Sequence, residues 1–371
     1  MRININLEAG DPDAEAPESA IKAAIEAIKS GGEWTHYSHL GRTKPREVFL
    51  EAVVEYYERF GPKYKPEQIL PTASSGAALY IAMATVVDRG DEIIIFDPTF
   101  VGYFGKLKTM RVKPIYARLS KDIGFHIDYD SLKNCISDKT KAILLCNPNN
   151  PTGTVFTRDE LNAIRDLALD NDLYVIADEI YLHFVYDDNF FTSIASLDGM
   201  LERTINVMSF SKTFSMTGWR LGYAIVPESL LPKSKEYLSL SSSNPSSFVL
   251  AAGASALKEG WRYVEDRRRE YQKRRDFFCK AVNSIDGLSC KPFEGAFYAW
   301  MDISETGLGS EQFVEQLNKS ENVQLSPGSR FGSNSDGFVR AALVKPVPIL
   351  EEAIRRLERF IDSTIKTEGR D

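Results

Sequence analysis

The segment SFSKTFSMTGWRLGY (209–223) carries the residue types best suited to chemistry. Lys212 directly follows an apolar run and lies among Ser, Thr and Phe side chains. Partial burial there favours the neutral amine, which is the form that makes a Schiff base with an aldehyde. Arg220 adds a fixed cation eight residues later, and Ser209 and Ser211 add hydroxyls. The set suits an aldehyde that also carries a phosphate, although a solvated lysine and a surface arginine explain this segment alone equally well.

The motif DEIY (178–181) stands at the end of another apolar run. A carboxylate that emerges from such a strand needs a positive partner, and a protonated pyridine nitrogen is one. Tyr181 lies three residues on and could reach an oxygen of the same ring. Taken alone, Asp178 could equally be the N-cap of a helix.

Two turn motifs complete the candidate site. In NPNNPTG (147–153) two Asn-Pro steps favour a rigid, non-helical turn that presents Asn150 as a donor. In TASSGAAL (72–79) small residues open a helix, whose first backbone N–H groups can hold a phosphate. An ordinary turn and an ordinary capped helix are the alternatives for these two motifs.

A mainly parallel sheet is the element that must position these residues. Strands that are apolar on both faces belong to sheets covered on both sides, and helix patterns at 74–88 and 157–171 alternate with them here. We therefore predict an α/β fold, with seven strands sandwiched by helices and ligands bound beyond the carboxyl ends of the strands. The predicted strands are 68–72, 91–98, 113–119, 141–148, 173–179, 205–211 and 221–227.

The pattern changes after the polar break SSSNPSSF (241–248). A long charged helix is predicted at 261–282, with its charges on a solvated face and its aromatic residues turned inward. Shorter strands at 295–303 and 337–344 and a helix at 349–365 follow, which is typical of a smaller α+β domain. The predicted organisation is an N-terminal segment (1–35) that packs with the small domain, a large domain (36–260) and the small C-terminal domain (261–371).

Composition excludes several classes of function. With 45 Lys and Arg against 52 Asp and Glu, the net charge of −7 argues against a broad grip on nucleic acid. Four Cys without a CxxC pair give no disulfide scaffold, and the four His do not pair with Cys at zinc spacing, so we expect no metal. No stretch approaches the roughly 20 apolar residues of a membrane helix, and the N-terminus has no apolar signal region. We expect a cytoplasmic protein without membrane partners.

In their order and spacing, the four motifs together resemble the pyridoxal-phosphate-dependent aminotransferases of fold type I, class I/II, the aspartate-aminotransferase-like family. SxSK followed by Gly-Trp-Arg eight residues past the lysine is highly specific. The resemblance covers nearly the whole chain, since it also includes LEAGDPD (7–13), HYSHLG (36–41), SPGSRFG (326–332) and FVRAAL (338–343).

The resemblance implies a role for each matching residue. Lys212 would carry the cofactor, Asp178 would pair with its ring nitrogen, and Tyr181 and Asn150 would bind the ring oxygen O3′. Arg340 would bind the substrate α-carboxylate, and Gly10 and Asn150 would lie near the substrate. The implied phosphate ligands are Ser74, Ser75, Gly76, Ser209, Ser211 and Arg220, with Phe100 stacked on the ring and Tyr37 reaching the phosphate of the neighbouring subunit in a homodimer. Ser74 or Ser75 stands where the family commonly has Gly, so that contact is expected to change.

The expected activity is transfer of an amino group from an L-amino acid, aspartate as first choice, to a 2-oxo acid such as 2-oxoglutarate. Aromatic or alanine specificity remains open, as do other reactions on the same fold, such as C–S β-lyase, racemase or decarboxylase chemistry. β-Lyases often carry His at the position of Tyr181. A regulator that retains the fold would need an additional DNA-binding segment. A dicarboxylate substrate needs a second cation, for which Arg42, Lys44, Lys106 and Arg330 are candidates.

Overall fold

The computed structural model describes residues 3–38, 43–59, 61–241 and 244–368. Its main feature is an eight-stranded sheet in the order β2-β9-β8-β7-β6-β3-β4-β5. The five strands from β8 to β4 run parallel, whereas β9 and β5 are antiparallel to their neighbours. The seven predicted strands are confirmed, and the two-residue β5 extends the sheet. Their bounds are β2 (Ile69–Thr72), β3 (Glu92–Asp97), β4 (Lys113–Ser120), β5 (His126–Ile127), β6 (Thr140–Cys146), β7 (Tyr174–Asp178), β8 (Thr204–Ser209) and β9 (Gly222–Ile225).

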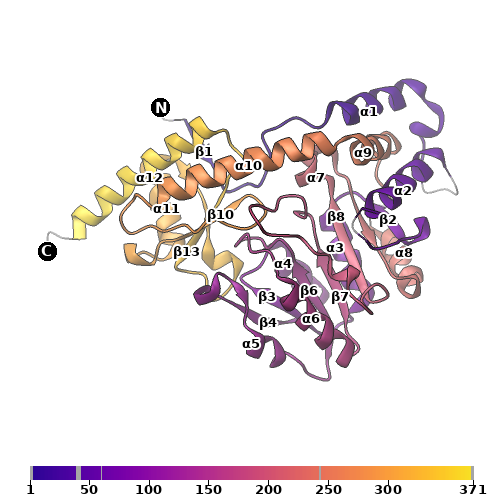
Figure 1. Cartoon of the computed structure of the whole chain (residues 1–371), viewed down its shortest axis with the longest axis horizontal. Helices are drawn as coiled ribbons and strands as arrows, with labels where there is room; N and C mark the ends of the chain where they lie inside the picture. The colour runs from indigo at the N-terminus through magenta and orange to yellow at the C-terminus, as the bar shows by residue number, and fades with distance from the viewer. Residues whose placement is uncertain (1–2, 39–42, 60, 242–243, 369–371) are drawn as a thin grey trace.

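Helices cover both faces of this sheet (Figure 1). Side chains alternate between the faces of a strand, so Ile93 and Ile95 of β3 enter one hydrophobic core while Ile94 and Phe96 enter another. The first core is covered by α3 (Ser75–Val86), α4 (Gly102–Met110) and α8 (Leu231–Leu240), and the second by α5 (Tyr129–Lys133) and α6 (Arg158–Asp170). A third core joins the β2–β9 side of the sheet to α1 (Glu18–Ser30), α2 (Lys44–Tyr57) and α9 (Ser247–Glu259).

The C-terminal part is built around a three-stranded antiparallel sheet in the order β10-β13-β12. The N-terminus joins it through a short parallel pairing of β1 (Ile5–Asn6) with β11 (Val323–Gln324). α1, later in the same N-terminal segment, packs against α9, and the assignment of the segment 1–35 to the small domain stays a prediction. The boundaries at 35 and 260 stay a prediction. The remaining elements are α10 (Trp261–Val282), β10 (Tyr298–Asp302), α11 (Ser310–Glu321), β12 (Ser326–Pro327), β13 (Phe338–Ala342) and α12 (Val347–Glu368).

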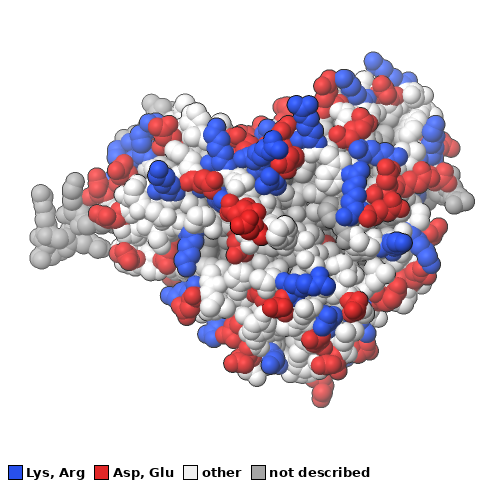
Figure 2. Space-filling view, in the orientation of Figure 1, with Lys and Arg blue, Asp and Glu red and all other residues white. Residues whose placement is uncertain are grey.

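The long helix α10 differs from the expectation that its charges are solvated. Arg274 and Arg275 are each only 3% exposed. Arg274 binds Asp13 at 2.9 Å, and Arg275 binds Asp187 at 2.7 Å. A buried guanidinium needs such partners, and these two connect α10 to segments far away in the chain. On the face shown in Figure 2, basic and acidic side chains alternate along the edge where α10 runs. Within the described ranges, no helix is long and apolar enough to cross a bilayer.

Candidate active site

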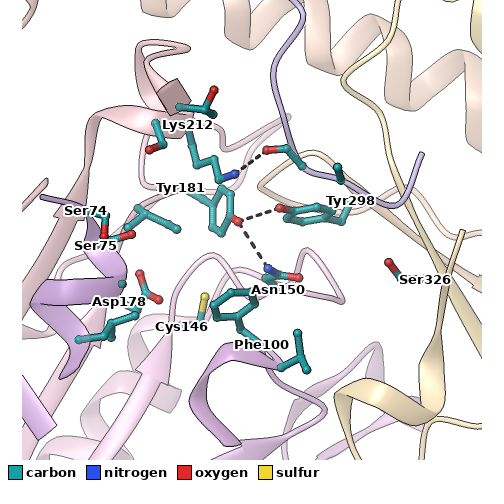
Figure 3. A pocket seen from close by; sticks show the side chains of 18 of the residues that line it. Ser74, Ser75, Phe100, Cys146, Asn150, Asp178, Tyr181, Lys212, Tyr298 and Ser326 are labelled. Atoms are coloured by element: carbon teal, nitrogen blue, oxygen red, sulfur yellow. Dashed lines mark hydrogen bonds between the residues drawn. The ribbon is translucent and has the colours of Figure 1, made fainter. Parts of the chain in front are cut away.

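A pocket of about 600 Å³ lies at the carboxyl ends of the parallel strands, between the main sheet and the C-terminal part (Figure 3). Most of the predicted site residues line it, although they come from segments far apart in the sequence. Those that line it are Gly10, Ser74, Ser75, Gly76, Phe100, Asn150, Asp178, Tyr181, Ser211, Lys212, Arg220 and Arg340. Ser209 and Tyr37 are not among the described residues that line it.

Asp178 ends β7 and is 1% exposed. The hydroxyl of Tyr103, on α4, donates to its Oδ2 at 2.7 Å. Oδ1 has no partner among the described residues. Burial raises the pKa of Asp178 to about 6, while the hydrogen bonds from Tyr103 and the Ile180 backbone and the charge of Lys106 oppose that rise. A buried acceptor therefore faces the pocket without a protein donor, which is a place for a cationic N–H group.

Tyr181 lies above this carboxylate within a small hydrogen-bond network. Its hydroxyl is 2.9 Å from the hydroxyl of Tyr298 and accepts from Nδ2 of Asn150 at 3.5 Å (Figure 3). Burial raises the pKa of Tyr181 well above its usual value, so the phenol is neutral and can donate. Tyr298, on β10, was missed by sequence reasoning. It lies close to Gly10, because a Cβ added at Gly10 would overlap the Tyr298 hydroxyl.

Lys212 is held by a short helix, α7 (Phe210–Thr213), that follows β8 directly. Its Nζ donates to the backbone oxygen of Gly10, so the amine points into the pocket (Figure 3). The Oγ of Ser209 caps α7 by accepting the N–H of Ser211 at 3.1 Å. Ser209 therefore caps the helix and is not among the described lining residues, whereas Ser211 lines the pocket.

One end of the pocket is formed by the N-terminus of α3. Ser74 caps this helix through its Oγ, which accepts from the backbone of Ala77 at 3.2 Å. Gly222 of β9 lets the turn approach the sheet, since a Cβ there would lie 2.6 Å from the backbone nitrogen of Ser75. Arg220 lies at the exposed rim in the left-handed region (φ 57°), and it donates to the Thr217 carbonyl at 2.6 Å. Backbone N–H groups, hydroxyls and a guanidinium thus converge on one end of the pocket.

Arg340 lies at the opposite end and is 7% exposed. It donates to Oδ1 of Asn150 at 2.9 Å and to the carbonyl of Glu8 at 2.7 Å. Its guanidinium lies between two rings, 4.3 Å from that of Tyr298 and 4.7 Å from that of Phe331. This packing fixes the planar cation in one orientation, which suits recognition of a carboxylate. Because Oδ1 of Asn150 accepts from Arg340, its Nδ2 is directed toward Tyr181.

Two predicted aromatic residues, Phe100 and Tyr37, differ in their relation to the pocket. Phe100 lines the pocket, and its ring meets that of Tyr103 edge-on at 5.4 Å. Tyr37 is 74% exposed, in a segment whose His36 carbonyl accepts from Ser247 of α9. The end of the HYSHLG motif, residues 39–41, and Arg42 lie outside the described residues.

This arrangement fits pyridoxal phosphate group by group. The amine of Lys212 suits the aldehyde, the unpartnered oxygen of Asp178 suits a protonated ring nitrogen, Tyr181 and Asn150 suit the ring oxygen, and the start of α3 suits the phosphate. Among the described residues, no group of three or more His, Cys, Asp or Glu could hold a metal ion. The fold and the site therefore define a pyridoxal-phosphate enzyme that acts on amino acids.

Comparison with known proteins narrows this class. The family model for aminotransferase class I and II matches residues 2–357. Aromatic-amino-acid aminotransferase 2 of Thermococcus litoralis is 38% identical, with 96% of this chain and 91% of that protein covered. Aspartate aminotransferase of Pyrococcus horikoshii is 36% identical, covering 96% and 90%. The crystal structure of an aromatic aminotransferase from Pyrococcus horikoshii superposes with a TM-score of 0.92 at 36% identity, covering 97% and 96%.

The chain belongs to the class I and II aminotransferase family, and it is a transaminase that uses pyridoxal phosphate. The predictions of fold, enzyme class and cofactor are confirmed. The relatives carry both aspartate and aromatic names, so the donor is not settled by them.

Proposed function

We propose that this transaminase takes its amino group from L-aspartate and passes it to 2-oxoglutarate. The observation that supports this choice is a second arginine, Arg330, which lines the pocket together with Arg340. Aspartate and 2-oxoglutarate each carry two carboxylates, and two guanidinium groups match them.

Of the other candidate cations, Lys106 also lines the pocket. It lies close enough to Asp178 for its charge to lower the pKa of that carboxyl. That position is the ring-nitrogen end, away from Arg340. Lys44 is not among the described residues that line the pocket, and its Nζ lies 6.0 Å from the centre of the Trp34 ring. Arg42 lies outside the described residues. Arg330 is therefore the candidate that the pocket favours.

The roles of the chain's own residues follow from their positions. When bound, pyridoxal phosphate supplies an aldehyde and a ring that withdraws electrons from the substrate Cα. Asp178 Oδ1 would accept a hydrogen bond from the protonated ring nitrogen and so keep that nitrogen charged, and Tyr181 and Asn150 would donate to the ring oxygen. Arg340 holds the α-carboxylate, and the Lys212 amine moves a proton from Cα as a general base and returns one as a general acid. The residues that would hold the phosphate are Ser74, Ser75, Gly76, Ser211 and Arg220.

A second candidate donor is an aromatic amino acid. Besides Tyr181, the described residues that line the pocket include the aromatic residues Phe100, Tyr298 and Phe331, together with the two arginines. They can pack against an aromatic side chain, and an aromatic donor still places its α-carboxylate on Arg340.

A panel of amino donors with 2-oxoglutarate tests the proposal. We expect aspartate to give the highest kcat/KM, phenylalanine and tyrosine to give lower values, and alanine the lowest. A panel in which aspartate is inactive while aromatic donors react would make the second candidate the correct one.

We also propose a cytoplasmic homodimer with two shared active sites. The exposed Tyr37 supports it, because this residue lies outside its own chain's pocket and could enter that of a two-fold-related partner. Sedimentation of the active enzyme tests the dimer, and an active monomer would contradict it. Cell fractionation tests the location.

A further inference from the structure

An ion pair lies inside the substrate pocket. Nη1 of Arg330 is 2.9 Å from Oε1 of Glu8, and both side chains line the pocket. They are 50% and 42% exposed. A second carboxylate, that of Glu311, is 3.8 Å from Nε of Arg330, and Glu311 is not among the described residues that line the pocket.

This pair lies at the end of the pocket where the substrate α-carboxylate binds. The backbone carbonyl of Glu8 accepts from Arg340 at 2.7 Å. Arg330 directly precedes Phe331, whose ring lies 4.7 Å from the Arg340 guanidinium. The Glu8 carboxylate is therefore already paired with Arg330, the cation that an acidic substrate side chain would need.

We propose that Glu8 is an exchangeable internal carboxylate that lets Arg330 serve both acidic and apolar donors. With an aromatic or aliphatic donor, Glu8 stays on Arg330, so that no unpaired guanidinium is desolvated against an apolar side chain. With an acidic donor, the side-chain carboxylate replaces Glu8 on Arg330, and Glu8 turns to solvent. This inference rests on the proposed function and extends it to a mechanism of dual specificity.

The exposure of the pair suits such an exchange. Half-exposed ion pairs contribute little net stability, and breaking one leaves no buried, uncompensated charge, so the contact with Glu8 can be broken when a competing carboxylate arrives. Arg340 is different, because it is buried and held by aromatic rings on both sides. Arg340 is thus a fixed arginine for the α-carboxylate that all donors share. Arg330 is an exchangeable arginine for the side chain, which differs between donors.

Three variants of the cofactor-loaded enzyme test the exchange. Glu8→Gln removes the competing charge and leaves the backbone carbonyl that binds Arg340. Arg330→Gln removes the cation. Glu311→Gln is the matched control, because it removes the other carboxylate near Arg330 from outside the lining of the pocket. For each, kcat/KM is measured with aspartate and with phenylalanine. Binding of succinate and of 3-phenylpropionate, which carry no amine, is measured by calorimetry.

We expect Glu8→Gln to raise kcat/KM for aspartate and the affinity for succinate by about two- to fivefold, the range of an exposed ion pair. Arg330→Gln should lower both by about tenfold or more, because a charged hydrogen bond is lost. Phenylalanine and 3-phenylpropionate should lose about two- to fivefold in Glu8→Gln, because Arg330 is then left without its carboxylate beside an apolar side chain, and Glu311→Gln should match the wild type with all four compounds.

Parallel changes for acidic and aromatic compounds in Glu8→Gln and Arg330→Gln would overturn the exchange, and would make the pair a structural contact. Aspartate turnover in the wild type would then still support the proposed donor. Conversely, a wild type that does not use aspartate, with a Glu8→Gln variant that gains succinate binding, would refute the proposed donor and retain the exchange. Unchanged succinate binding in Arg330→Gln would also overturn it.

Discussion

Replacing Asp178 by Asn should separate stability from activity. The carboxyl is 1% exposed, and burial raises its pKa from 3.8 to about 6. Between about pH 4 and pH 6 the folded, cofactor-free protein therefore keeps a proton on Asp178 that the unfolded chain has lost. Its free energy of unfolding falls as the pH rises through this range. The shift of about 2 pKa units corresponds to roughly 3 kcal/mol above pH 6. Asn cannot ionise, so cofactor-free Asp178→Asn should be as stable as the wild type or more stable at pH 7.5, by up to that amount.

Activity should change in the opposite direction. The free Oδ1 of Asp178 is the group placed to stabilise a protonated ring nitrogen, and an amide lacks the charge to do so. Loss of one such electrostatic contact in a dry site lowers the rate by about 10²–10³-fold. We expect that loss in kcat, with a much smaller change in cofactor affinity.

The assay pairs steady-state kinetics with thermal unfolding of the cofactor-free protein between pH 4 and 8. Tyr103→Phe is the control, since it removes the hydroxyl that lowers the pKa of Asp178 and retains the carboxylate. The pH at which the activity of Tyr103→Phe falls on acidification should be higher than in the wild type, because the pKa of Asp178 rises without that hydrogen bond. Near-complete turnover by Asp178→Asn, or a cofactor-free variant clearly less stable than the wild type at pH 7.5, would refute the reasoning.

Three further predictions follow from the contacts described above. Lys212→Ala should bind cofactor and lose turnover, and borohydride reduction of the wild type followed by peptide mapping should label Lys212; label on another lysine would contradict its role. Tyr37→Phe should weaken cofactor retention by about 1.5–3 kcal/mol, the value of a hydrogen bond to a charged group. Mixing Tyr37→Phe with Lys212→Ala should restore activity in hybrid dimers. Equal cofactor retention by Tyr37→Phe and the wild type would argue against a Tyr37 that reaches the partner's active site. Glu160 and Glu294 raise the pKa of His126 to about 10, so its stabilising charge is complete below about pH 6.5 and is lost as the pH rises through 10. His126→Gln should therefore flatten the decline in unfolding free energy over that window, which reaches about 1.4 kcal/mol per pH unit at most, and a variant with an unchanged slope would contradict this.

The strands could be predicted from the sequence because they depend on local apolar patterns, whereas the cofactor roles came from the order and spacing of the motifs, which resemble one family. Apolar runs define the parallel strands, and Asp178 and Lys212 follow those runs directly. Residues brought in by other segments could not be found in this way. Tyr103 contacts Asp178 from α4, the helix between β3 and β4. Tyr298 contacts Tyr181 from β10 in the C-terminal part.

Charge pattern was a poorer guide than apolar pattern. The charge pattern of α10 predicted that its arginines are solvated, yet Arg274 and Arg275 are buried. They pair with Asp13 and Asp187, which are distant in the sequence. The same limit applies to Glu8 and Arg330, which are separated by most of the chain and meet in the pocket. Whether a charged residue is solvated or paired depends on its partner, and the spacing within one segment does not reveal that partner.

Substitutions at Gly10, which lines the pocket, and at Gly222, which lies against the turn at the start of α3, should respond differently to a second mutation. At Gly10 the atoms that exclude a methyl group belong to the Tyr298 phenol, whereas at Gly222 they are backbone atoms of Ser75, Ser74 and Met208, 2.6, 2.7 and 2.8 Å away. A harmful Gly10→Ala change can therefore be relieved by a second-site suppressor such as Tyr298→Phe, which removes the overlapping hydroxyl. Gly222→Ala has no comparable suppressor, because no side-chain replacement moves those backbone atoms. In a directed-evolution library, Gly10 is a position to vary together with Tyr298, and Gly222 is a position to hold constant.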